Sequence, residues 1–287
     1  MPYFSHFPSV SYSMDKNDLT KVQVVKDITV RAKISEYFKN SAMTSLPYEV
    51  QDGERPETLA HRIYDRSDLH WVILLFNEIH DSSFEWPLSS AELESVIATK
   101  YKGQSIYYPD AAASSTSPSL IFLNQDIPIL AKANTIHQRL SDGSVISANI
   151  LKWNPTYNQI VIDGEEASRF DPSYDFPNSI DGYARFFIDN DERKLLAFSR
   201  IQPYEYSVDH FEDADGNTLN PRSGPPSDVT STSSILNRYV TQVGFTEVLA
   251  IDNRTQEYKV NENKRTIRVI KPEFMSAIVT QFRSLFI

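Results

Sequence analysis

Three histidines in the first third of the chain are the first candidates for chemistry, because histidine is a common ligand of protein-bound metals. His61, His70 and His80 are nine and ten residues apart. Zinc-binding histidines on a helix stand one turn apart instead, and finger-type sites need spacings that this sequence lacks. We therefore expect ordinary polar positions for these residues and no metal site.

Carboxylates gather in two places that could suggest calcium loops. The segment DHFEDADGNTL brings Asp209, Asp213 and Asp215 close to Gly216, and a smaller acidic group lies at 189–192. In an EF-hand the glycine has a fixed place and a bidentate glutamate closes the loop, and neither condition is met here. A solvated acidic turn is the favoured interpretation.

The sequence carries no motif for covalent, hydrolytic or phosphate chemistry. It has no Gly-x-Ser-x-Gly elbow, no His-Glu-x-x-His, no phosphate loop and no cysteine. Trp71 could stack on a sugar ring, but it stands in a nearly all-apolar segment, which favours core packing. We predict a non-enzymatic protein without catalytic residues or cofactors. A lytic enzyme in the middle of the chain is the least favoured alternative.

The composition of the chain limits the classes of partner that it could bind. The 287 residues carry a net charge of −10 and 40% hydrophobic residues, enough for one or two cores. The acidic balance argues against nucleic acid and against anionic membranes, which both attract clustered Lys and Arg. No run approaches the ~20 apolar residues that span a bilayer, and the N-terminus does not resemble a secretory signal. With 15 tyrosines and 16 phenylalanines, the chain suits large packed surfaces.

The elements that would position these residues are clearest between residues 46 and 101. The spacing predicts a strand over 46–50, and the turn QDGE follows it, in which Gly53 is free to take positive φ. A helix over 55–65 begins with Pro56 at a favoured first position. A nearly all-apolar helix over 69–79 follows, with Ser67 as its cap, and a third helix spans 91–101 after Ser89 or Ser90.

Beyond residue 109 the pattern changes from helical to alternating, which indicates strands. The small polar segment 109–119 is the expected linker, and 220–234 is a second loop. Strands are expected over 119–123, 127–131, 144–153, 158–163, 184–189 and 194–199, then over 264–272 before a helix that opens at Pro272.

The predicted fold class is therefore α+β, and four regions are expected. Residues 1–45 form an N-terminal arm and lead-in, and 46–108 form a β-α-α-β module. Residues 119–205 form a small β-rich, barrel-like domain. Residues 206–287 combine a loop region with a C-terminal strand and helix.

The region 46–108 resembles a LysM module. LysM sequences share a Tyr-x-Val-x-x-Gly-Asp turn, a helix with Ile-Ala and a second helix that ends in Leu-x-x-Asn. Glu54 departs from the usual aspartate, and Arg55-Pro56 departs from the usual Thr-Leu. The residues that the resemblance assigns to the motif and its core are Tyr48, Val50, Gly53, Leu59, Ala60, Ile63, Trp71, Leu74, Asn77 and Trp86.

A longer stretch is similar to the LysM-like baseplate wedge proteins of contractile-tailed, T-even-like bacteriophages. It carries Tyr64-Asp65, the run from Trp71 to Leu75, and Trp86-Pro87 in the order of that family, and 261–286 resembles the end of its longer members. The resemblance implies a virion protein of the tail baseplate, assembled in the host cytoplasm. It would join neighbouring wedges in a sixfold ring, and its partners would be other wedge and tail subunits. A LysM module that binds peptidoglycan through N-acetylglucosamine chains is the alternative.

Both ends of the chain carry apolar side chains in excess of what one small domain can bury. An obligate interface resembles a core cut in half, so such residues are candidates for subunit contacts. The candidates are Tyr3, Phe4 and Phe7 at the N-terminus and Phe274, Ile278, Phe282, Leu285 and Phe286 at the C-terminus.

Overall fold

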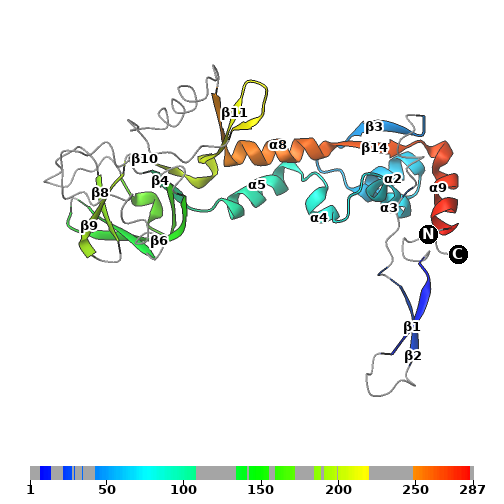
Figure 1. Cartoon of the computed structure of the whole chain (residues 1–287), viewed down its shortest axis with the longest axis horizontal. Coiled ribbons are helices and arrows are strands. Elements are labelled where there is room, and N and C mark those ends of the chain that lie inside the picture. Colours follow the sequence, from blue (N-terminus) through cyan, green and yellow to red (C-terminus); the bar gives the residue numbers. More distant parts are fainter. Residues whose placement is uncertain are drawn as a thin grey trace. The chain divides into compact units, whose positions relative to one another are not determined.

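The computed structural model describes residues 7–13, 22–27, 29, 34, 43–107, 134–140, 142–154, 159–171, 184–188, 191–198, 200–219 and 248–284 (Figure 1). By its internal contacts the chain divides into two compact units. Unit 1 joins residues 1–93 to 258–287, and unit 2 consists of residues 94–257. Unit 1 is therefore built from two stretches that are far apart in sequence. The region boundaries expected from sequence stay a prediction.

Unit 1 mixes short strands with helices. Its elements in chain order are β1 (Ser9–Ser13), β2 (Val22–Lys26), β3 (Ser45–Glu49), α2 (Pro56–Tyr64), the 3-10 turn η2 (Ser67–Leu69), α3 (His70–Phe76), α4 (Ser82–Glu85), the start of α5 (Ser90–Lys100), the end of α8 (Asn253–Arg265), β14 (Thr266–Ile270) and α9 (Pro272–Ser284). Strands β1 and β2 form a separate antiparallel ribbon, and β3 pairs with β14.

The pairing of β3 with β14 joins the two stretches of unit 1. The strands are antiparallel, with Ser45 opposite Ile270 and Glu49 opposite Thr266, and Figure 1 shows them side by side. The strands expected over 46–50 and 264–272 are thus confirmed. The second strand of the sheet comes from the C-terminal segment instead of following the helices directly, so the LysM-like arrangement stays a prediction.

The expected helices are present with altered ends. Helix α2 has Pro56 in its first turn and ends at Asp65, whose φ of 55° is left-handed. The apolar helix expected over 69–79 is shorter, since α3 spans only His70–Phe76. It stops because Glu78 also adopts a left-handed φ of 59°. Ser67 does not cap α3 but begins the 3-10 turn that precedes it.

Two apolar clusters fill unit 1. One lies between the sheet and the helices and contains Val50, Leu59, Ala60, Ile73, Trp86, Ile267 and Val269. The other lies between α3 and α9 and contains Phe7, Ile34, Leu69, Trp71, Val72, Phe76, Ile270, Met275, Ile278 and Phe282. Helix α3 contributes to both clusters, which is why nearly all of its faces are apolar.

Unit 2 is dominated by strands. In chain order the strands are β4 (Gln104–Tyr107), β5 (Thr135–Arg139), β6 (Val145–Asn154), β7 (Gln159–Asp163), β8 (Ala184–Ile188), β9 (Asp191–Phe198), β10 (Arg200–Pro203), β11 (Val208–Asp213), β12 (Thr218–Leu219) and β13 (Val248–Asp252). Short 3-10 turns lie at Ala167–Arg169 and Tyr204–Tyr206. The strands expected over 144–153, 158–163, 184–189 and 194–199 are confirmed as β6, β7, β8 and β9.

The main sheet of unit 2 has the order β10-β4-β7-β6-β5-β8-β9, and a smaller one has the order β12-β11-β13. The expected barrel is wrong in one respect, because within the described residues the edge strands β9 and β10 do not pair with each other. A barrel closes only when its first and last strands share hydrogen bonds. The sheet instead stays open and packs on a core made mainly of isoleucines and phenylalanines.

Some expected elements fall outside the described residues. They are the linker 109–119, the strands over 119–123 and 127–131 and the loop 220–234. None of the helices that the structure describes is both long and apolar enough to cross a membrane.

Candidate functional site

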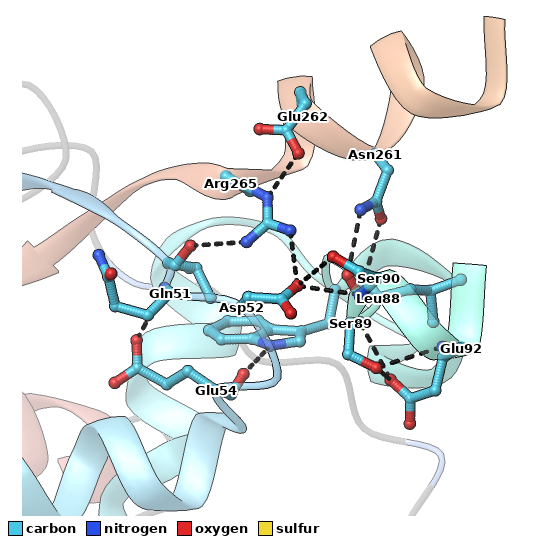
Figure 2. Close-up of polar contacts among 12 residues, drawn as sticks. Gln51, Asp52, Glu54, Leu88, Ser89, Ser90, Glu92, Asn261, Glu262 and Arg265 are labelled. Carbon is cyan, nitrogen blue, oxygen red and sulfur yellow. Dashed lines mark hydrogen bonds and ion pairs between the residues drawn. The ribbon is translucent and has the colours of Figure 1, made fainter. Parts of the chain in front are cut away.

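Asp52 is the centre of a polar cluster that ties the C-terminal stretch of unit 1 to the N-terminal one (Figure 2). Its Oδ1 accepts hydrogen bonds from the Ser90 amide at 2.9 Å and from Arg265 Nη2 at 3.0 Å. Arg265 also donates to Glu262 Oε1 at 2.8 Å and to the Val50 carbonyl at 3.1 Å. The Arg265 guanidinium therefore lowers the pKa of the Asp52 carboxyl, with help from Ser90.

The turn after β3 is fixed by a buried carboxylate. The Glu54 side chain is only 6% exposed, and its Oε2 accepts from Tyr48 Oη at 2.8 Å and from the Gln51 amide at 3.2 Å. Arg62 on α2 forms an ion pair with the same carboxylate and also contacts Tyr48 Oη. Burial, together with the neighbouring Glu54, raises the pKa of Tyr48. Glu54 thus fixes the conformation of the turn, although LysM sequences usually have an aspartate at this position.

Trp86 borders a hollow of about 600 Å³ in unit 1. Its indole is 5% exposed and donates to the Glu54 carbonyl at 2.7 Å. The residues that line the hollow are Gly53, Glu54, Arg55, Pro56, Glu57, Ser82, Ser83, Trp86, Pro87, Leu88, Ser89 and Glu92. The lining mixes hydroxyls and carboxylates with two prolines and contains no histidine or cysteine, so it offers no general base of the histidine type.

Two asparagine side chains link the N-terminal and C-terminal stretches of unit 1. Each bonds to both the backbone amide and the carbonyl of one residue in the other stretch, and we call such a pair of bonds a clamp. Asn77 accepts from the Arg268 amide at 2.9 Å and donates to the Arg268 carbonyl at 2.8 Å, as a neighbouring strand would. Asn261 on α8 does the same for Leu88, accepting from its amide at 2.8 Å and donating to its carbonyl at 3.1 Å. Asn261 is 3% exposed. Sequence reasoning assigned Asn77 from the motif but missed Asn261 and Arg265.

Helix α5 begins with a reciprocal capping box. The Ser89 amide and hydroxyl donate to Glu92 Oε2 at 3.0 and 2.7 Å, and the Glu92 amide donates to Ser89 Oγ at 3.3 Å. These bonds lower the pKa of the Glu92 carboxyl. Of the two caps that the sequence allowed, Ser89 is therefore the cap.

The residues of the predicted motif mostly lie together. Val50, Leu59, Ala60 and Trp86 belong to the cluster beneath the sheet, and Tyr48, Ile63 and Leu74 pack against it half-buried. Gly53 adopts a φ of 70°, as its turn requires. Trp71 lies instead in the cluster between α3 and α9, 4.5 Å from the Phe282 ring.

The candidates for subunit contact divide into two groups. Phe7, Ile278 and Phe282 are at most 3% exposed, and Phe274 packs half-buried beside them, so unit 1 covers these side chains itself. The physical reason is that α9 packs against α3, whose second apolar face needs cover. Tyr3, Phe4, Leu285 and Phe286 fall outside the described residues. A role for any of them in subunit contacts stays a prediction.

No group of three or more metal-ligating side chains gathers within the described ranges. His70 Nδ1 lies 3.0 Å from the Ser67 carbonyl within its own turn. In the acidic loop, the Asp213 carboxylate accepts from the amides of Asp215 and Asn217 at 3.0 and 2.8 Å. The Asn217 contacts lower the pKa of Asp213. The loop therefore uses this carboxylate to form its own turn.

Comparison with known proteins gives two matches. Residues 3–108 match the family described as base plate wedge protein 53. The baseplate wedge protein gp53 of Enterobacteria phage T4 is 32% identical over 78 residues, which are 25% of this chain and 40% of the T4 protein. The match thus spans less than half of the relative's length. Both descriptions refer to the baseplate wedge, and neither gives support to the alternative of peptidoglycan binding.

Proposed function

We propose that this chain is a structural subunit of a phage tail baseplate that joins neighbouring wedges. The match of residues 3–108 to the baseplate wedge family, together with the similarity to the T4 wedge protein, carries the proposal. The protein would reside in the tail baseplate of the virion after assembly in the host cytoplasm. Its partners would be other wedge and tail proteins, and six copies of the chain would lie around a ring.

The hydrogen-bonded polar groups of unit 1 support the role of a rigid structural subunit. The polar groups around Asp52, Glu54, Asn77 and Asn261 are engaged with one another and with backbone groups, which fixes loops and helix ends. Of these groups, Glu54 and Asn261 are buried, and buried polar groups with satisfied hydrogen bonds rigidify a structure and specify one arrangement. A subunit that transmits position between neighbours benefits from such rigidity.

Assembly of purified wedges tests the proposal. Wedges of the same virus, assembled without this chain, would be mixed with the full-length protein and examined by sedimentation and negative-stain microscopy. We expect sixfold rings only when the chain is present, with a stoichiometric amount of it bound. Rings of equal yield without the chain, or rings that exclude it, would contradict the proposal.

A second experiment tests the alternative of peptidoglycan binding. The same preparation would be incubated with purified peptidoglycan sacculi and pelleted at several salt concentrations. A wedge connector stays in the supernatant, while salt-resistant pelleting at micromolar concentration would favour a glycan-binding protein instead.

A further inference from the structure

The ribbon β1–β2 exposes more apolar surface than the other strand pair described in unit 1. Val24 is 74% exposed, Tyr12 is 58% exposed and Val22 is 50% exposed, and Val10 and Val25 follow at 38% each. Opposite residues share a face of an antiparallel ribbon, so Val22 and Val24 lie on one face and Val10, Tyr12 and Val25 on the other. Both faces thus carry apolar side chains that are open to solvent.

The base of the ribbon is held by unit 1. Phe7, two residues before β1, is 3% exposed and lies 6.4 Å from the Phe282 ring, centroid to centroid. The Asp27 amide donates to the Pro8 carbonyl at 2.9 Å, and Lys26 Nζ donates to the Phe7 carbonyl at 2.7 Å. The ribbon therefore starts from an anchored position, which lowers the entropic cost of docking its exposed part.

The two strands lack the features that protect natural sheet edges. Such edges carry charges, prolines or bulges that discourage pairing. Here the register runs from Ser9 opposite Lys26 to Ser13 opposite Val22 without a shift, and Lys26 is the one charged residue of the two strands. Within the part of the chain that the structure describes, no third strand pairs with the ribbon. A two-stranded ribbon is marginally stable on its own.

The charge and the side chains of the ribbon indicate which kind of partner could bind to it. Phosphate groups and anionic membranes require positive charge, and the single lysine of these strands is already bonded at the base. A second copy would bring two chains of net charge −10 together. A ribbon that is rich in valine, carries a single charge and pairs with no third strand among the described residues instead suits an edge strand of a different protein, which would gain main-chain hydrogen bonds and apolar contacts at once.

We propose that the ribbon β1–β2 is a docking element: an edge strand of another baseplate wedge protein adds to β2, with Val22 and Val24 buried at the contact. The inference rests on the proposed function, since it takes the partner from the same baseplate. Its residues are exposed in the folded chain, whereas Phe7, Ile278 and Phe282, which were candidates at the apolar ends, are buried.

Binding of the full-length chain to purified wedge proteins of the same virus, tested one at a time, checks the inference. Val24→Lys places a charge on the exposed face, and Val24→Thr keeps a β-branched, uncharged side chain at the same position. Leu249→Lys on β13 is the matched control, because Leu249 is 58% exposed on an edge strand of unit 2. We expect Val24→Lys to weaken the complex about tenfold or more, and Val24→Thr and Leu249→Lys to leave it nearly unchanged.

Hydrogen exchange supplies the structural readout. In the complex, the amides of 9–13 and 22–26 should become protected, while the free chain exchanges them rapidly. Complexes that form with unchanged affinity for Val24→Lys and no protection would overturn the docking inference and leave the proposed function intact. Failure to bind any wedge protein would instead sink both. Protection of the ribbon in the isolated chain, with concentration-dependent dimerisation, would overturn the inference in favour of a second copy.

Discussion

Replacing Asn77 by aspartate tests whether the clamp on β14 holds unit 1 together. The Asn77 amide nitrogen donates to the Arg268 and Ile73 carbonyls, each at 2.8 Å, while its oxygen accepts from the Arg268 amide at 2.9 Å. Asn77→Asp preserves shape and the accepted bond but removes both donated bonds. At about 1 kcal/mol for each, and with a carboxylate facing two carbonyl oxygens, we expect a loss of about 2–3 kcal/mol in unfolding free energy at pH 7.

The loss should depend on pH in a defined direction. The two carbonyl oxygens disfavour the ionised form, so the introduced carboxyl has a folded pKa above its unfolded value of about 3.9. A raised folded pKa means that stability is retained below the unfolded pKa and is lost as pH rises through the folded one. The difference between Asn77→Asp and the parent protein should therefore be smaller near pH 4 than at pH 7.

Urea unfolding followed by tryptophan fluorescence measures this difference. Trp71 and Trp86 lie in unit 1 and Trp153 in unit 2, so a Trp153→Phe background restricts the signal to unit 1. Asn263→Asp, at an exposed position of α8 in unit 1, is the matched control and should change stability by less than about 0.5 kcal/mol. Equal midpoints for Asn77→Asp and its parent at pH 7, or a deficit that does not shrink at acidic pH, would refute the clamp.

Three further changes probe the same unit. Phe282→Ala should destabilise it by about 3–5 kcal/mol in urea unfolding because Phe282 is 2% exposed, whereas Phe84→Ala, at a residue 74% exposed, should have little effect; equal effects would contradict the assigned core. Asn261→Ala should cost about 2 kcal/mol in the same assay, since it leaves the half-buried amide and carbonyl of Leu88 without their partner, and an unchanged midpoint would exclude the second clamp. Asp52→Asn removes one of the two carboxylate partners of Arg265, the other being Glu262. Because the folded pKa of Asp52 is lowered, its contribution is present above the unfolded pKa and is lost as pH falls through the folded one, so the stability gap between wild type and variant should narrow in acid.

Local patterns were sufficient to predict α2, α3, α5 and α9, but they gave neither the exact ends of these helices nor α4 and α8. Pro56 and the apolar spacing that follows define α2, and Ser89 with Glu92 defines the start of α5, because these signals act within one turn. The end of α3 is different. It depends on the left-handed Glu78 and on a bond from Asn77 to a residue 191 positions away, which no local window contains.

Long-range partners explain why part of the site could not be predicted. Arg265 and Asn261 lie in α8, a polar helix without an apolar stripe, so periodicity gave no signal for it. Their role arises only when Asp52 and Leu88 are brought beside them by folding. The apolar face of α9 and the nearly all-apolar α3 were both visible in the sequence, but their packing on each other was not, because the two helices lie far apart along the chain.

The family match ends at residue 108, yet the fold that it begins is completed beyond residue 258. Strand β3 has its pairing partner in β14, and Trp71 has its cover in Phe282. The core beneath the sheet likewise includes Ile267 and Val269. A segment of 3–108 alone would therefore expose the apolar faces of α3 and an unpaired strand. Unit 1 thus combines most of the stretch that matches the wedge family with a C-terminal stretch that completes its sheet and core.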